Sequence, residues 1–347
     1  MVKPGILHDF KSCAALNVPS APLIFPIFEE TAASCAGQLY HNYSTQSNTI
    51  VEVWNNAIER FDISWVGLFI DDLFEYEHLG ITIEDGPNHP FAVIKYLPAE
   101  KKVLESLRLP DFKRDGRLPI LMESQRRLRD RWGDNVVISK SVAAPFTGLT
   151  LLHGIAPVML LVYENPDLLR KTMAFTESLS IEFSRALIEA GTDIIWLGDC
   201  CASSRFLSFD LFREFAYEPA KRVISAIHKA GGMVIYHAAE NMLPFLEEMS
   251  GMGADVLSVE SGIDLEIVKQ TVGKRVALSG NLDGINLIWH GRPDEIKREV
   301  RRLVVRVASQ GGVIVNTGEG IPKQTSLENL DTMFHTIREE WQSLAQL

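Results

Sequence analysis

The side chains of this sequence best able to do chemistry follow short runs of apolar residues, one run after another along the chain. Each run has the length and β-branched content of a buried strand, with polar or ionisable residues directly after it. These residues are Asp71, Asp72, Ser141, Asp199, Cys200, Cys201, His237, Glu240, Asn241, Glu260, Asn281, Asp283 and Glu319. The set is acidic and contains one histidine and two adjacent thiols, which restricts the chemistry that it could support.

Two kinds of chemistry fit this set. In the first, His237 and Glu319 bind Zn²⁺, because zinc accepts nitrogen, oxygen and sulfur ligands and leaves one position open for substrate. A third ligand would come from Glu240 or from a thiolate of Cys200 or Cys201. Such a metal would polarise a bound oxygen or sulfur as a Lewis acid. In the second, no metal binds, and the carboxylates and His237 transfer protons directly.

Each of these residues alone also has a structural interpretation. A histidine at a strand end is often a buried structural residue, and Glu240 could favour a helix N-terminus through the helix dipole. Cys200 and Cys201 could be small buried apolar residues. The hypothesis of a shared site therefore depends on whether the fold brings these strand ends together.

The segment Gly311–Asn329 positions the last carboxylate of the set. Val313–Val315 reads as a buried strand, and Gly318 and Gly320 flank Glu319, so the backbone can turn sharply just past the strand. Active sites of α/β folds lie at such strand ends. Glu319 could equally be a solvated turn residue.

Predicted strands alternate with predicted helices along the chain, which is typical of parallel βαβ units. The pattern predicts a single α/β domain over residues 1–347, a (β/α)8 TIM barrel with an N-terminal helical or irregular extension. We expect residues 1–60 to form part of the barrel mouth. The predicted strands are Pro22–Phe28, Ile63–Ile70, Val136–Val142, Asp193–Leu197, Met233–Tyr236, Asp255–Val259, Arg275–Leu278 and Val313–Val315.

The segments between the strands read mainly as helices. Three segments are interpreted otherwise: Met1–Ser20 as an irregular lead-in, Gly80–Leu97 as a loop with an extended part, and Pro145–Gly148 as a turn. The predicted helices are Glu29–Asn42, Ile50–Arg60, Ala99–Leu107, Leu118–Trp132, Ala156–Tyr163, Pro166–Ala190, Phe209–Ala230, Met242–Gly251, Asp264–Val272, Pro293–Ser309 and Asn329–Gln346.

Composition narrows the classes of partner. The formal net charge of −11 argues against nucleic acid and anionic membranes, since both attract positive proteins. The N-terminus MVKPGILHDF lacks the apolar run of a signal peptide, and Ala156–Tyr163 is too short to span a bilayer. The four cysteines form no CxxC motif. These features predict a cytoplasmic protein with reduced thiols.

Four motifs carry a resemblance to a known family. The stretch from Asp71 to Leu330 resembles the uroporphyrinogen decarboxylase superfamily, which also contains the corrinoid-protein and coenzyme M methyltransferases. The matching motifs are APFTG (Ala144–Gly148), GTDIIWLGD (Gly191–Asp199), ALSGNLDGINLIWHG (Ala277–Gly291) and NTGEGIPKQTSLENL (Asn316–Leu330). The resemblance implies a (β/α)8 barrel. It also raises a homodimer as a candidate assembly, because the decarboxylase branch is dimeric.

The decarboxylase branch fits this sequence poorly. Its arginine-rich N-terminal segment corresponds here to Pro22–Ala36, which contains no arginine. Asp71 matches the pyrrole-binding aspartate of that branch, but Cys200 stands at the place of a binding-site serine and Glu319 at the place of a histidine. Leucines Leu151 and Leu152 lie where a tyrosine is expected after the APFTG motif. An acidic rim would also repel a polycarboxylated substrate.

The methyltransferase branch fits better but with departures. Its zinc site uses a His-x-Cys motif and a cysteine of the last glycine turn; His237 matches the histidine, whereas Ala239 and Glu319 replace the cysteines. A zinc site of His237, Glu240 and Glu319 would be our inference and not a pattern of the family. Its oxygen-rich ligands would suit a methyl group bound to oxygen better than a thiol.

The leading hypothesis is therefore a methyltransferase that moves a methyl group from a small O-methyl or N-methyl donor to the cobalt of a separate corrinoid protein. Cobalamin would arrive on that partner, because the chain lacks a DxHxxG cobalamin motif. A carboxy-lyase acting on a different small acid and a non-catalytic binding barrel remain as alternatives. Catalytic roles are predicted for Asp71, Asp199, Glu240 and Asn241, and substrate contacts for Ser141, Phe146, Cys200 and Asn281.

Overall fold

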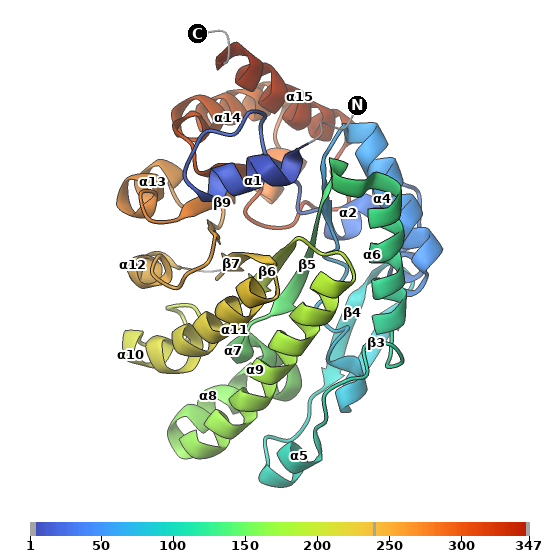
Figure 1. Cartoon of the computed structure of the whole chain (residues 1–347), viewed down its shortest axis with the longest axis vertical. Helices are drawn as coiled ribbons and strands as arrows, with labels where there is room; N and C mark the ends of the chain where they lie inside the picture. The colour runs from blue at the N-terminus through green and yellow to red at the C-terminus, as the bar shows by residue number, and fades with distance from the viewer. Residues whose placement is uncertain (1–4, 239–240, 345–347) are drawn as a thin grey trace.

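Eight parallel strands form the centre of the molecule (Figure 1). The structure is a computed structural model that describes residues 5–238 and 241–344. The strands lie side by side in the order β1-β10-β9-β8-β7-β6-β5-β2, so each strand from β6 onwards pairs with the one before it in the chain. They are β1 (Ile24–Phe25), β2 (Trp65–Gly67), β5 (Val137–Ala143), β6 (Ile194–Gly198), β7 (Met233–His237), β8 (Val256–Ser258), β9 (Ala277–Asn281) and β10 (Val313–Asn316).

The two ends of this strand order meet through aromatic packing. Phe25 of β1 stacks on Trp65 of β2 with ring centroids 4.4 Å apart and an interplanar angle of 14°. Stacking of this kind adds to the apolar area that the two rings bury. The sheet is thus a nearly closed, TIM-like barrel, and the predicted fold class is confirmed.

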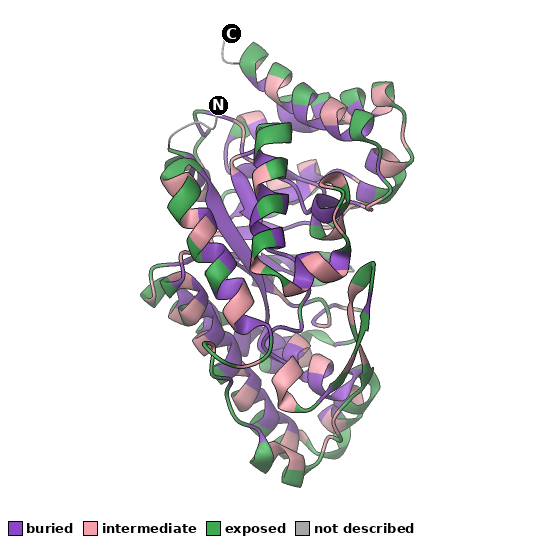
Figure 2. Cartoon of the chain, turned by 90° about the vertical axis from the view of Figure 1, so that its right-hand side faces the viewer, coloured by how far each residue is buried: buried purple, intermediate pink, exposed green. Residues whose placement is uncertain are grey.

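Helices surround the strands and bury their inner faces against them (Figures 1 and 2). The described helices are α1 (Ile6–Ala14), α2 (Glu29–Cys35), α3 (Tyr40–Thr45), α4 (Ser47–Phe61), α5 (Lys101–Ser106), α6 (Leu118–Trp132), α7 (Pro145–His153), α8 (Ile155–Glu164), α9 (Pro166–Glu189), α10 (Phe209–Phe212), α11 (Glu218–Lys229), α12 (Leu246–Met249), α13 (Leu265–Val272), α14 (Pro293–Arg306) and α15 (Leu327–Leu344). Short helical turns of other types lie between some of them.

Local sequence signals begin several of these helices. Ser208 is the N-cap of α10 and accepts a hydrogen bond from the backbone N–H of Leu211 at 3.4 Å. Asn165 accepts one from the N–H of Leu168 at 3.1 Å, and Pro166 follows it at the first helical position, where proline's fixed φ suits a helix. These caps satisfy backbone donors that the helix itself leaves without partners.

Four of the predicted element assignments differ from the structure in whole or in part, each for a local reason. Met1–Ser20 contains the helix α1, whose apolar residues pack under the barrel. Gly80–Leu97 contains the antiparallel strands β3 (Thr82–Gly86) and β4 (His89–Lys95). Pro145–Gly148 is the first turn of α7, with Pro145 beginning the helix. Glu29–Asn42 is two helices, because the chain turns at Gly37 with a φ of 68°.

Two of the three apolar clusters among the described residues pack directly against the barrel strands along their length. One lies between the strands and the surrounding helices, and the other fills the barrel interior. The interior core contains the aromatic side chains Phe25, Trp65, Phe69 and Trp196. These rings fill the barrel below its carboxyl end, so a cavity at that end lies above them.

Within the described residues, no single helix is long and apolar enough to cross a membrane. The pair α7 and α8 together reaches that length and composition, but the two helices are bent by 112°.

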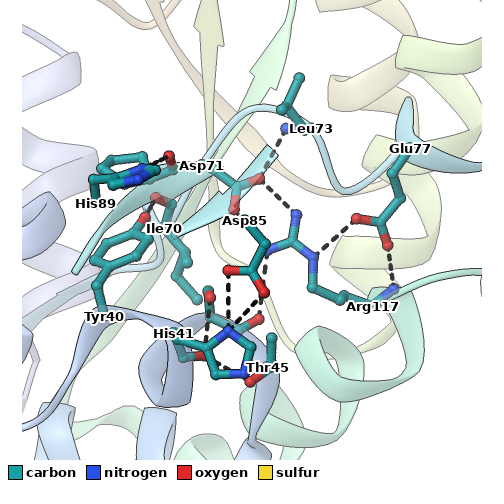
Figure 3. Close-up of polar contacts among 12 residues, drawn as sticks. Tyr40, His41, Thr45, Ile70, Asp71, Leu73, Glu77, Asp85, His89 and Arg117 are labelled. Atoms are coloured by element: carbon teal, nitrogen blue, oxygen red, sulfur yellow. Dashed lines mark hydrogen bonds and ion pairs between the residues drawn. The ribbon is translucent and has the colours of Figure 1, made fainter. Parts of the chain in front are cut away.

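A buried arginine connects the segments that follow β2 (Figure 3). The Arg117 guanidinium donates to both carboxylate oxygens of Asp71, at 2.6 and 3.0 Å, and its Nε donates to Glu77 at 2.9 Å. Its plane also lies over the rings of Phe74 and Phe91, at 4.1 and 4.0 Å from their centroids. Arg117 therefore links the β2 end, the β3–β4 hairpin and the start of α6.

Replacing this arginine should destabilise the fold strongly. Arg117→Ala would leave two buried carboxylates without their partner, and we expect a loss of about 3–5 kcal/mol in the free energy of unfolding. The matched control is Arg131→Ala, which removes an exposed ion pair with Glu59 and should cost less than about 1 kcal/mol. Urea denaturation of both variants would measure this, and equal losses would contradict the role given to Arg117.

Candidate active site

A cavity of about 420 Å³ opens at the carboxyl ends of the strands. Its described lining combines carboxylates, one histidine and an apolar wall. The lining residues are Ile27, Glu29, Phe69, Ile70, Asp71, Asp72, Leu73, Pro90, Phe91, Val93, Tyr96, Ser141, Val142, Ala143, Thr147, Leu151, Trp196, Gly198, Cys200, His237, Gly318, Glu319 and Gly320. This is the end of a (β/α)8 barrel at which active sites lie.

His237 and Glu319 meet in this cavity, as the sequence predicts. The imidazole Nε2 lies 3.7 Å from the Glu319 Oε1. On its other side, the His237 Nδ1 is 3.0 Å from the Ser258 hydroxyl, and the ring lies against Trp196 with centroids 4.8 Å apart. Burial lowers the pKa of His237 to about 4, so the imidazole is neutral at neutral pH.

A tight turn after β10 places Glu319 opposite the histidine. Gly318 has a φ of 72°, and its N–H donates to the side-chain oxygen of Asn316 at 2.7 Å. A Cβ on Gly318 would come within 2.9 Å of the Val259 carbonyl oxygen and within 2.8 Å of the Ser261 nitrogen. The glycine is therefore required both by its backbone conformation and by the close approach of the β8–α13 loop.

Asp71, Ser141 and Cys200 also line the cavity, but their side chains differ in availability. The Asp71 carboxylate is paired with Arg117, and the Ser141 hydroxyl donates to Asp72 at 2.9 Å. The Cys200 thiol is exposed at the cavity mouth, yet desolvation and the nearby carboxylates raise its pKa well above the usual range. It is thus a protonated thiol at neutral pH and a poor source of a thiolate ligand.

Other predicted residues lie outside the described lining. Asp199 is buried, and its carboxylate accepts hydrogen bonds from the Thr147 hydroxyl at 2.9 Å and the Tyr236 hydroxyl at 3.0 Å. Burial raises the pKa of Asp199 to about 6. The alternation of side chains along a strand explains this position. Trp196 points into the barrel, and Asp199, three residues later, points to the opposite side.

The remaining predicted site residues either make contacts away from the cavity lining or lie outside the described residues. Phe146 is fully buried in the outer core. The amide nitrogen of Asn281 donates to the Glu260 and Ile263 carbonyls at 3.0 and 2.6 Å, and that of Asn241 donates to the Ser204 hydroxyl at 2.7 Å. Glu240, predicted as both a catalytic residue and a metal ligand, lies outside the described residues.

Sequence reasoning missed Glu29, whose carboxylate reaches the cavity from the N-terminal end of α2. Glu29 is open to solvent at the mouth but surrounded by protein elsewhere, and desolvation together with Asp72, Glu319 and Glu30 raises its pKa to about 7. The β3–β4 hairpin was missed as well; Pro90, Phe91 and Val93 add an apolar wall. The sequence does contain a signal for Glu29, because a carboxylate at the start of the helix that follows the first strand lies near the carboxyl end of the barrel.

Two of the three ligands that the zinc hypothesis requires, His237 and Glu319, lie together in the described part of the chain. The His237–Glu319 distance of 3.7 Å is close to the roughly 3.4 Å that separates two ligands of one tetrahedral zinc ion. Within residues 5–238 and 241–344, no group of three His, Cys, Asp or Glu side chains could hold a metal. The pair therefore fits a metal only if a further ligand comes from outside these ranges, where Glu240 lies.

The fold and this site define a TIM-barrel protein of the enzyme type, with ionisable groups gathered at the carboxyl end of the strands. The sequence profile of the uroporphyrinogen decarboxylase (URO-D) family matches residues 11–340. The chain belongs to the URO-D family, which confirms the resemblance read from its four motifs.

Proteins of two different activities are similar in sequence to this chain. It is 26% identical over 260 residues to the methylcobamide:CoM methyltransferase MtaA of Methanosarcina barkeri, covering 74% of each protein. It is 25% identical over 328 residues to the uroporphyrinogen decarboxylase of Neisseria meningitidis serogroup C, covering 90% of this chain and 88% of the relative. A methyltransferase from Methanosarcina mazei has the same fold, with a TM-score of 0.87 at 24% identity over 97% of this chain and 99% of that one.

The glycine turn should tolerate no side chain. Gly318→Ala would force a Cβ against backbone atoms of the β8–α13 loop at a positive φ, and we expect a loss of about 2–4 kcal/mol in stability or a displaced Glu319. The control is Gly231→Ala, which also has a positive φ but no atom within 4 Å of the new Cβ, and should cost about 1–2 kcal/mol. Thermal unfolding of both variants would reveal an equal loss if the close approach were unimportant.

The buried histidine should make stability depend on pH. The unfolded chain takes up a proton on His237 below about pH 6.5, whereas the folded chain does so only near pH 4. The free energy of unfolding should therefore fall as pH drops from 6.5 to 4, by up to about 3 kcal/mol from this group. His237→Gln should remove this pH-dependent contribution to stability. Urea unfolding of the wild-type protein and the variant between pH 6.5 and 4 would measure the difference. Identical pH profiles would contradict a neutral buried imidazole.

Proposed function

We propose that this protein is a methyltransferase that moves a methyl group from a small O-methyl or N-methyl donor to the cobalt of a separate corrinoid protein. The observation that carries the proposal is the His237–Glu319 pair, 3.7 Å apart in a cavity large enough for a small molecule. Membership of the URO-D family and the likeness to the methylcobamide:CoM methyltransferase MtaA support it.

The charge of the cavity argues against a polycarboxylated substrate. Its described lining contains four carboxylates and no lysine or arginine. The nearest arginine, Arg117, already pairs with Asp71 and Glu77. A substrate rich in carboxylates would therefore meet repulsion without a compensating cation.

In the proposed mechanism, the apolar wall of the cavity excludes water and His237 faces the methyl donor as a neutral ligand or hydrogen-bonding group. With its raised pKa, Glu29 holds a proton in part of the molecules at neutral pH and could donate it to a leaving oxygen. If zinc binds, His237, Glu319 and Glu240 would hold it, and it would supply Lewis-acid polarisation of the donor. The cobalt acceptor arrives on the partner protein.

A carboxy-lyase that acts on a different small acid is the second candidate. The alignment with the Neisseria meningitidis decarboxylase favours it, since it spans 90% of this chain. In such a reaction Glu29 would protonate the carbon that loses its carboxylate. The four carboxylates of the lining disfavour an anionic substrate and rank this candidate second.

Methylation of added cob(I)alamin tests the leading candidate. Purified protein with small methyl ethers and N-methyl amines should produce methylcobalamin, followed by its absorbance, and His237→Ala and Glu319→Gln should each lower the rate by about 100-fold. Glu59→Gln, on the far surface, is the matched control and should keep the rate.

Zinc content of the same preparations separates the two chemistries. Zinc present in the wild-type protein and lost in both variants would assign the pair as metal ligands. Release of CO₂ from small acids, without any methyl transfer, would overturn the methyltransferase in favour of the lyase.

A further inference from the structure

The mouth of the cavity carries an excess of negative charge. Glu29 and Asp72 both line it, and both are open to solvent there. They lie close enough that Asp72 is the carboxylate that contributes most to the raised pKa of Glu29. Like charges held near one another stay costly until a cation or a proton lies between them.

The two cationic side chains next to the cavity, Arg117 and Lys140, already have other partners. Arg117 is enclosed by Asp71, Glu77 and the rings of Phe74 and Phe91. Lys140 is fully buried, and its Nζ donates to the Ser141 carbonyl and hydroxyl oxygens at 2.8 Å each. Neither belongs to the described lining. Lys140 reaches Asp72 only indirectly, through the Ser141 hydroxyl that donates to Asp72 at 2.9 Å.

The rest of the described lining suits the apolar surface of a methylated cation. Phe69, Tyr96 and Trp196 line the same cavity, together with aliphatic side chains. Aromatic walls combined with carboxylates favour quaternary ammonium groups, which spread their charge over methyl groups and donate no strong hydrogen bond.

We propose that Glu29 and Asp72 form a cation-recognition site in the mouth of this cavity and that the methyl donor is a small quaternary ammonium compound. The inference rests on the proposed function for the reaction itself, and it narrows the donor from ethers and amines in general to permanently charged amines. Glu29 and Asp72 bind and orient the charged nitrogen, while the buried His237 faces Glu319 in the same cavity.

The reaction balances without an added proton. The carbon–nitrogen bond of one methyl group breaks with its electron pair left on nitrogen, and that methyl carbon forms a bond to the Co(I) of the partner's reduced corrinoid. The released amine is a neutral leaving group, so no acid is needed.

Binding of choline to the full chain tests the inference without any corrinoid. Isothermal titration calorimetry should show choline bound at least about tenfold more tightly than its neutral isostere, in which a tert-butyl group replaces the trimethylammonium group. Glu29→Gln and Asp72→Asn should each weaken choline binding by about tenfold and leave binding of the isostere unchanged.

Glu30→Gln is the matched control, because it makes the same change one residue away on a side chain that pairs with Lys323 outside the lining. It should keep the affinity for choline within about threefold. Equal binding of choline and its isostere, or choline binding that neither cavity variant weakens, would overturn the cation site. Methyl transfer from ethers alone would overturn it and leave the proposed function standing. Tight choline binding without methyl transfer from any donor would keep the cation site and overturn the proposed function, together with the donor assigned to it.

Discussion

Carboxylates from separate segments of the barrel line one cavity in this protein. They repel one another, and neighbouring side chains offset part of that repulsion. Arg117 neutralises Asp71 and Glu77 from behind the lining, and the Ser141 hydroxyl donates to Asp72. Among the residues that the structure describes, no cation pairs with Glu29, and its pKa rises to about 7. Because parallel strands all present their carboxyl ends at one side, this concentration of charge is a direct consequence of the barrel.

The same arrangement separates two regions of the cavity. At the strand ends, a neutral His237 held by Ser258 and Trp196 faces Glu319 on a glycine turn that permits no side chain at Gly318. At the mouth, Glu29 and Asp72 lie in contact with solvent. The His237–Glu319 pair is suited to holding or polarising a reacting group, and Glu29 with Asp72 to attracting a cation. The two pairs interact, since Glu319 contributes to the raised pKa of Glu29.

The sequence predicted the barrel because buried strands and amphipathic helices alternate at regular spacing, and it predicted that His237 and Glu319 would meet. It could not predict which side of a strand end each residue occupies: the structure directs His237 into the cavity and Asp199 outward onto Thr147. The contacts of Glu29 and Arg117 could not be predicted for a different reason. Each belongs to a helix or its start, and only the packing of that helix against the barrel decides what it contacts.

A crystal structure of the protein with bound choline would test the central claim most directly, because it shows the His237–Glu319 pair and the mouth together. We expect the ammonium nitrogen within about 6 Å of the Glu29 and Asp72 carboxylates, with His237 and Glu319 facing the same cavity. Choline bound elsewhere, or a Glu319 side chain turned out of the cavity, would contradict both the proposed chemistry and the site assigned to the cation.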